Sequence, residues 1–187
     1  AGTGTSSRKV GPYTVGVRVQ SNFGLPWRFT IAGVPVGEIL NPDETEHAFG
    51  QKPSGNSIIV IVATDAPLLP MQLERLAKRP AFGIARVGGV AERASGELFL
   101  AFSTANRHGR PDAEIVTYQA LTDDAEYTLD YLYEAVIQAT EEAIINASIA
   151  AETMVGVDDF AVQRLDHGAV RHILRAHNRL IDPEQSE

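Results

Sequence analysis

The segment from Ser57 to Thr64 constrains the fold more than any other part of the chain, and its sequence is Ser-Ile-Ile-Val-Ile-Val-Ala-Thr. Its centre is continuously apolar and β-branched, a composition that favours a strand. A strand without polar alternation is typical of one that is covered on both faces. The sequence therefore predicts a strand with protein layers on both sides.

The segment before this strand, from Asn41 to Gly55, has the opposite character. It is rich in Pro, Gly, Glu and Asp and has almost no apolar residues. Such a segment cannot bury enough surface to offset the entropy that ordering costs, so we expect an exposed, mobile loop. Ser57 then lies at the border between the loop and the strand.

Further strands are expected on both sides of the loop. Tyr13 to Gln20 alternates Val with other residues, which indicates a half-buried strand. Phe29 to Val36 is a weaker strand candidate, because Gly33 and Pro35 interrupt it. Glu97 to Ser103 is predicted to be another buried strand.

Three segments have the pattern of helices. Pro70 to Arg79 carries apolar residues broadly on one side and basic residues near its end. Asp123 to about Glu152 repeats apolar residues at intervals of three and four. Asp166 to Leu180 is a shorter amphipathic segment. Strands on both sides of a loop, followed by helices, indicate a layered α/β architecture.

The composition excludes several classes of function. The 16 basic and 24 acidic residues give a net charge of −8, which argues against nucleic acids and anionic membranes as main partners. The chain has no cysteine, so disulfides, thiolate nucleophiles and Cys-based zinc sites are excluded. No ligand cluster suggests a metal or a cofactor. The apolar runs are too short to span a bilayer, and we expect a soluble protein of the bacterial cytoplasm or periplasm.

A serine nucleophile needs a base, because a hydroxyl at its ordinary pKa attacks poorly. The chain has five histidines, and none lies in a recognisable triad context. An N-terminal serine has another base, since its α-amine, with a pKa of roughly 7.7–8, can accept the hydroxyl proton. Cleavage before Ser57 through an N→O acyl shift would create this terminus. On pattern alone, a serine that simply opens a strand explains the same residues.

The junction around Ser57 has a distinctive sequence. From Gly55 to Leu68 it is Gly-Asn-Ser-Ile-Ile-Val-Ile-Val-Ala-Thr-Asp-Ala-Pro-Leu. This segment closely resembles the self-cleavage junction of the DmpA/BapA-type aminopeptidases, which comprise L-aminopeptidase D-amidase/esterases and β-peptidyl aminopeptidases. Gly2 to Arg8 and Val17 to Gly24 are similar to two further segments of that family. The resemblance covers essentially the whole chain.

The resemblance implies a four-layer αββα sandwich of the self-processing DmpA/ornithine-acetyltransferase type. It implies cleavage between Asn56 and Ser57. Residues 1–56 would then end the large subunit and include the exposed linker, residues 57–187 would form the small subunit, and together they would make one domain. Because the family has a longer large subunit, we expect an upstream segment as a partner. The resemblance also implies a homo-oligomer of αβ units.

The resemblance assigns roles to four residues. Ser57 would be the nucleophile, and Asn22 would donate to the oxyanion, a role that its side-chain amide suits. Ser95 and Glu97 would orient and polarise the nucleophile. Being two positions apart, they would face the same side of a strand. The resemblance implies no metal and no cofactor.

The implied activity is removal of an N-terminal residue from a short peptide, amide or ester through an acyl-enzyme on Ser57. The family prefers N-terminal β-amino acids or small L-residues, and Asn56 looks more like the β-peptidyl branch. One alternative is a self-processing acyltransferase of the ornithine acetyltransferase type, which uses a threonine nucleophile. The other is a non-catalytic binding domain of the same fold.

Overall fold

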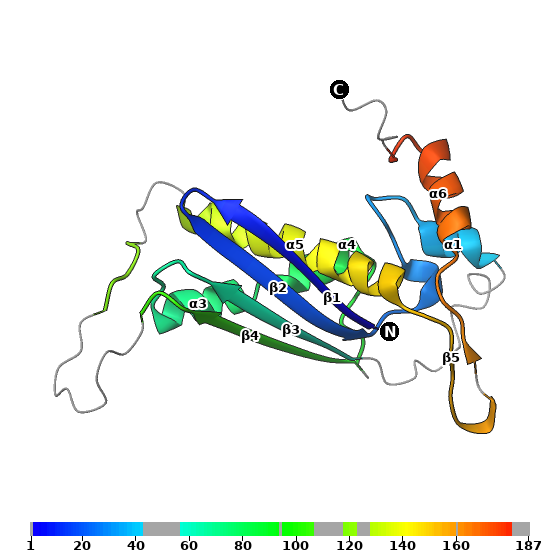
Figure 1. Ribbon diagram of the computed structural model, residues 1–187, viewed down its shortest axis with the longest axis horizontal. Coiled ribbons are helices and arrows are strands. Elements are labelled where there is room, and N and C mark those ends of the chain that lie inside the picture. Colours follow the sequence, from blue (N-terminus) through cyan, green and yellow to red (C-terminus); the bar gives the residue numbers. More distant parts are fainter. Residues whose placement is uncertain are drawn as a thin grey trace.

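The computed structural model describes residues 2–42, 57–93, 95–106, 118–122, 128–159 and 161–180. Its main body is a four-stranded sheet with helices packed against one face (Figure 1). The spatial order of the strands is β1 (Gly2–Val10), β2 (Tyr13–Asn22), β3 (Ser57–Thr64) and β4 (Gly96–Ser103). β1, β2 and β3 are antiparallel neighbours, whereas β4 runs parallel to β3.

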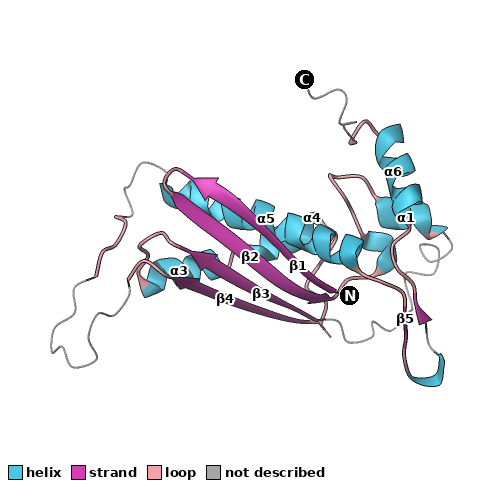
Figure 2. Ribbon diagram, viewed as in Figure 1, coloured by secondary structure: helices cyan, strands magenta, loops and turns pink. Residues whose placement is uncertain are grey.

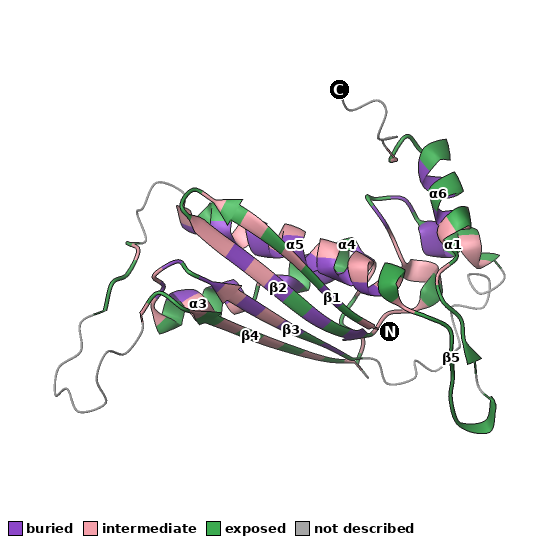
Figure 3. Cartoon of the chain, in the orientation of Figure 1, coloured by how far each residue is buried: buried purple, intermediate pink, exposed green. Residues whose placement is uncertain are grey.

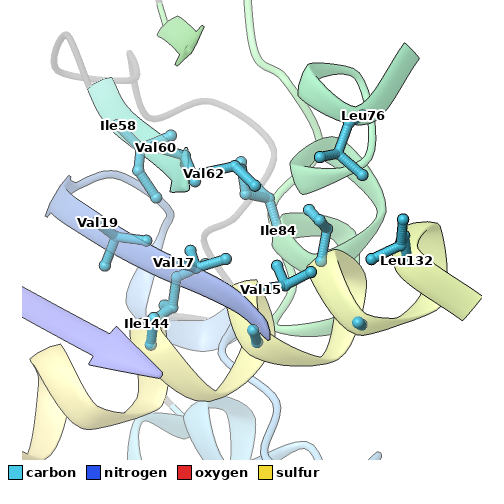
Figure 4. Close-up of a cluster of buried hydrophobic side chains, with 14 of the residues drawn as sticks. Val15, Val17, Val19, Ile58, Val60, Val62, Leu76, Ile84, Leu132 and Ile144 are labelled. Carbon is cyan, nitrogen blue, oxygen red and sulfur yellow. The ribbon is translucent and has the colours of Figure 1, made fainter. Parts of the chain in front are cut away.

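The core lies between this sheet and its helices. Six inward valine and isoleucine side chains of β2 and β3 are at most 2% exposed, and they are Val15, Val17, Val19, Ile58, Val60 and Val62. Leu132 and Ile144 of α5 (Thr128–Ala150) face them across the layer boundary (Figure 4). The alternation of Val in β2 therefore has the half-buried character that the sequence predicts.

The opposite face of the sheet is open in the described structure, so the described residues supply one of the two layers expected around β3, and the second layer stays a prediction. Ile59 is 44% exposed, whereas its neighbours Ile58 and Val60 are fully buried. Figure 3 shows the sheet coloured by burial. The pleat directs alternate residues to opposite faces, and no described element packs on the outer one. β4 is not a buried strand: it is an edge strand with Leu98 and Leu100 more than half exposed.

β1 is a strand that the sequence pattern did not predict. It has no apolar alternation, because its first inward positions are Gly2, Gly4 and Ser6, and the next is Arg8, which pairs with Glu142 of α5. A Cβ added to Gly4 would lie only 1.9 Å from the carbonyl oxygen of Ala143 in α5. The helix therefore lies directly against the β1 backbone at Gly2 and Gly4, which leaves no room for a side chain at these two positions.

The helices differ from the predicted ones mainly in their ends (Figure 2). The segment predicted as one helix is α3 (Pro70–Ala77), and a second helix that was not predicted, α4 (Pro80–Arg86), follows it. Pro80 explains the break, since proline lacks the N–H that would continue α3. α5 falls within its predicted range, and residues 123–127 lie outside the described part. None of the described helices has the length and apolar character needed to cross a membrane.

The last predicted helix is α6 (His167–Ala176), and it covers a small second core. The Asp166 carboxylate caps it by accepting hydrogen bonds from the backbone N–H groups of Gly168 and Ala169. The inward residues of α6 are Val170, Ile173 and Leu174, and they pack against Ile31, Val34 and Val36.

The prediction of a strand over Phe29–Val36 is wrong. A 3-10 turn, η1 (Pro26–Arg28), comes first, and Ile31 and Val34 then form an isolated bridge around a tight turn. Gly33 in this turn has a φ of +78°, a left-handed conformation that ends a strand. The short helix α1 (Val36–Leu40) follows Pro35.

A small hairpin connects α5 to α6. Its strands are β5 (Met154–Val155) and β6 (Ala161–Val162), and the turn η2 (Val157–Asp159) lies between them. All of its described residues are exposed, and it projects away from the main sheet (Figure 1). The mixed α/β class is thus as predicted, with one sheet layer and one helical layer.

Candidate active site

Two of the predicted site residues meet at one end of the main sheet. Asn22 is the last residue of β2 and Ser57 is the first residue of β3, and the strand register pairs them directly. The pairing follows from the antiparallel arrangement, in which the end of one strand lies beside the start of the next. A hydroxyl and a carboxamide are thereby brought to the same corner of the sheet from positions 35 residues apart in the sequence.

Both residues belong to the open face of the sheet. Their strand neighbours Ser21 and Ile58 are buried against the helices, so the pleat directs Asn22 and Ser57 to the other side. Both residues are exposed. The corner therefore presents a hydroxyl and an amide donor together to an incoming molecule.

Gly96, the first residue of β4, lies on the other side of Ser57. The parallel register pairs these two residues. A Cβ added to Gly96 would lie 3.2 Å from Ser57 Oγ and 4.0 Å from Ser57 Cβ. The Ser57 hydroxyl therefore lies next to the backbone of Gly96, which carries no side chain.

Ser95 and Glu97 flank Gly96 and interact with each other. The Ser95 hydroxyl donates a hydrogen bond to the Glu97 carboxylate. The register pairs Glu97 with Ile58, which places Glu97 on the helix-facing side of the sheet, whereas Ser57 belongs to the open side. The structure thus brings this pair to the strand position beside Ser57, and a direct contact of either residue with the nucleophile stays a prediction.

Asn56, the expected residue before the cleavage point, lies outside the described residues, as do residues 43–55. Ser57 is therefore the first described residue after this gap.

A cavity of about 870 Å³ begins beside Asn22. Phe23 and Leu25 line it from the chain that follows β2, and Leu40 and Ile144 line it from α1 and α5. These residues could not be identified from the sequence, because they come from three separate segments with no common motif. The cavity offers space for part of a ligand whose reacting group lies at Asn22.

The described histidines lie on or directly after α6, away from the main sheet, and His167 and His177 contact backbone carbonyl oxygens. One ring nitrogen of His167 is 3.0 Å from the carbonyl oxygen of Ile149. A ring nitrogen of His177 is 2.9 Å from the carbonyl oxygen of Ile173. Within the ranges that the structure describes, no group of three His, Asp or Glu residues is arranged to hold a metal ion.

Comparison with known proteins gives one consistent result. Residues 1–162 match the model of peptidase family S58. The β-peptidyl aminopeptidase BapA of Sphingosinicella microcystinivorans is 45% identical over 195 residues, which cover 96% of this chain and 48% of that protein. The chain thus spans about half the length of the curated relatives that it matches.

Two solved structures show the same relationship. The L-aminopeptidase D-Ala-esterase/amidase of Ochrobactrum anthropi, described as a new variant of the Ntn-hydrolase fold, is 42% identical with a TM-score of 0.79, covering 96% of this chain and 49% of that one. A β-aminopeptidase of Burkholderia sp. is 38% identical with a TM-score of 0.77, covering 94% and 49%. The sheet and helices of this chain therefore have the fold of part of an Ntn hydrolase.

Proposed function

The chain belongs to peptidase family S58, and from this membership we propose that it carries the nucleophile of a self-processing aminopeptidase. The observation that carries the proposal is the pairing of Ser57 with Asn22 on the open face of the sheet. A nucleophile and an oxyanion donor must both reach one carbonyl group, and this corner supplies both groups.

Self-processing comes first in the proposed sequence of reactions. Ser57 Oγ attacks the carbonyl carbon of Asn56, the new C–O bond forms, and the C–N bond to Ser57 breaks. The Ser57 nitrogen gains a proton and becomes an α-amine, while residues 1–56 remain attached as an ester. Water then hydrolyses the ester, leaving residues 1–56 and 57–187 as two fragments of one domain.

Substrate turnover repeats the same chemistry. The Ser57 α-amine takes the hydroxyl proton as Oγ attacks the substrate carbonyl, and the Asn22 amide donates to the developing oxyanion. The leaving amine departs with a proton, and water releases the acyl group from Ser57. Ser95 and Glu97 are assigned to hold the nucleophile in place from the adjacent strand.

The proposed substrates are short peptides, amides and esters with an N-terminal β-amino acid or a small L-amino acid. The relatives support both options, since one is a β-peptidyl aminopeptidase and another an L-aminopeptidase. The ornithine acetyltransferase alternative is not favoured, because the residue at the junction is serine rather than threonine. The homo-oligomer of αβ units stays a prediction.

The partner that we propose for the open sheet face is the upstream part of the large subunit. Ile59, Leu98, Leu100 and Phe102 are between 42% and 65% exposed on this face. Contiguous exposed apolar residues mark an interaction surface. A second sheet packed here would complete the expected four-layer sandwich and form the other wall of the site.

The Ser57→Ala variant of the full-length protein tests the nucleophile. Denaturing mass spectrometry of the wild type is expected to show a fragment that begins at Ser57. Ser57→Ala is expected to remain one chain and to lose hydrolysis of aminoacyl p-nitroanilides, because a methyl group cannot attack a carbonyl.

Ser7→Ala is the matched control. Ser7 is an exposed serine of β1, two strands away from Ser57, so its loss should leave processing and hydrolysis unchanged. Normal processing and turnover by Ser57→Ala would remove Ser57 from the mechanism and with it the proposed function.

A further inference from the structure

Gly96 combines an ordinary backbone conformation with a restricted position. Its φ is not in the left-handed region, unlike that of Gly11, Gly24, Gly33 and Gly88. The backbone therefore does not require a glycine here, and an L side chain could adopt the same conformation.

The space around Gly96 is limited by the nucleophile alone among the described residues. Apart from its two chain neighbours, the described atoms that a Cβ at this position would meet within 4 Å belong to Ser57, with Oγ at 3.2 Å and Cβ at 4.0 Å. Gly4 differs, because its Cβ would meet the backbone of α5. The absent side chain of Gly96 thus leaves space for the serine hydroxyl rather than for a neighbouring element.

From this geometry we propose that Gly96 is a positioning residue that keeps the β4 side of Ser57 Oγ clear for acyl transfer. The inference rests on the proposed function, because it assumes that Ser57 becomes acylated. A carbonyl carbon bonded to Oγ adds substituents close to it, and these must fit between β2, which carries Asn22, and β4. A methyl group on Gly96 would already touch the free hydroxyl.

The proposal makes acyl transfer sensitive to one methyl group without a cost in stability. Replacing glycine by alanine at an allowed φ is neutral or stabilising, since it lowers the entropy of the unfolded chain. The same methyl displaces Oγ by a few tenths of an ångström, or occupies the space of the acyl group. Activity and stability are thus expected to separate.

The test is Gly96→Ala in the full-length protein, with Gly16→Ala as the matched control. Gly16 is also a strand glycine of this sheet, and the nearest atom to its added Cβ is 4.0 Å away. Gly96→Ala is expected to slow self-cleavage and to lower kcat by roughly tenfold, a smaller loss than the roughly hundredfold typical of a misplacement by about 1 Å, because Oγ moves by only a few tenths of an ångström. KM and the Tm are expected to match those of Gly16→Ala, which carries its added methyl group on the same face of the sheet.

A second measurement separates a space-keeping role from a merely structural one. The loss in kcat is expected to be larger for alanyl p-nitroanilide than for glycyl p-nitroanilide, because the bulkier acyl group needs more space beside Gly96. An equal loss for both substrates, or a kcat that matches Gly16→Ala, would overturn the inference. Absence of hydrolysis and cleavage in the wild type would instead overturn the proposed function.

Discussion

At the scale of single residues, the proposed chemistry depends on one cross-strand pair. Asn22 and Ser57 end and begin neighbouring strands, and the antiparallel register sets them opposite each other. Such directly opposed residues have their Cβ atoms about 4.5–5.5 Å apart, which is close enough for both side chains to reach one carbonyl group. Neither residue would have this relation if the register slipped by one position, because their side chains would then point to opposite faces.

The Asn22→Ala variant tests the oxyanion role. Loss of one oxyanion donor typically costs about 10²–10³ in kcat, and we expect a decrease of that size in aminoacyl p-nitroanilide hydrolysis. Gln20→Ala is the control, since Gln20 is an exposed residue on the same face of β2. A kcat for Asn22→Ala close to that of the Gln20→Ala control would show that the oxyanion is stabilised elsewhere.

The sequence predicted only part of this site. The border between a polar segment and an apolar run indicated Ser57, and the family resemblance supplied Asn22, Ser95 and Glu97. The position of Gly96 could not be predicted, because its distance from Ser57 depends on a parallel register that no local pattern encodes. The sequence could not show either that Glu97 and Ser57 belong to opposite faces of the sheet, because this depends on how β3 and β4 are aligned.

At the scale of elements, the small residues of β1 determine how closely α5 can approach the sheet. A Cβ on Gly4 would come within 1.9 Å of the Ala143 carbonyl oxygen, and one on Gly2 within 2.8 Å of that of Ala147. The Asn146 side-chain amide also donates to the Thr5 carbonyl oxygen at 3.0 Å. The strand and the helix are thus in direct backbone contact, which joins the segment before Ser57 to a helix that follows it.

The Gly4→Ala variant is expected to destabilise the full-length protein. Its methyl group would meet backbone atoms that cannot rotate away, and overpacking of this kind typically costs about 1–3 kcal/mol in the free energy of unfolding. Chemical denaturation measures the loss, with Gly16→Ala as the glycine control, since the nearest described atom to its added Cβ is 4.0 Å away. Equal stability of the two variants would show that α5 moves away from β1 without cost.

The errors in predicting elements share this origin. β1 lacks an apolar alternation because α5 fills the space that large side chains would otherwise occupy. Phe29–Val36 has strand-forming residues, but the turn at Gly33 and the cover by α6 make it a compact bridge. Long-range packing determined the secondary structure of both segments. The helices with a clear periodicity, in contrast, were predicted from local sequence alone.

At the scale of the whole molecule, the two faces of the sheet are unequal. One face forms the core with α3, α4 and α5, and the other exposes Ile59, Leu98, Leu100 and Phe102. The β-branched run in β3 indicates protein layers on both faces, and the described residues supply one of them. The proposed large-subunit partner accounts for this difference.

Leu100→Lys tests whether the open face is covered in the full-length protein. Burying a leucine typically stabilises a protein by about 1.5–3 kcal/mol, so a lysine at a covered position is expected to cost at least about 2 kcal/mol in the free energy of unfolding. Met71→Lys is the control, because Met71 is 61% exposed on α3 in the helical layer. A loss no larger than that of the control would show that the face stays in water.

Ser57 begins a strand that has neighbours on both sides, and this has a consequence for the two products of a cut before it. The eight residues of β3 pair with β2 on one side and β4 on the other. The strand pairing would therefore keep a newly made chain end in place. The fragments could separate only if the hydrogen bonds between the strands broke and the core opened. The broken bond would change the chemistry of one residue while the molecule keeps its shape, so the precursor already holds the architecture of the mature form.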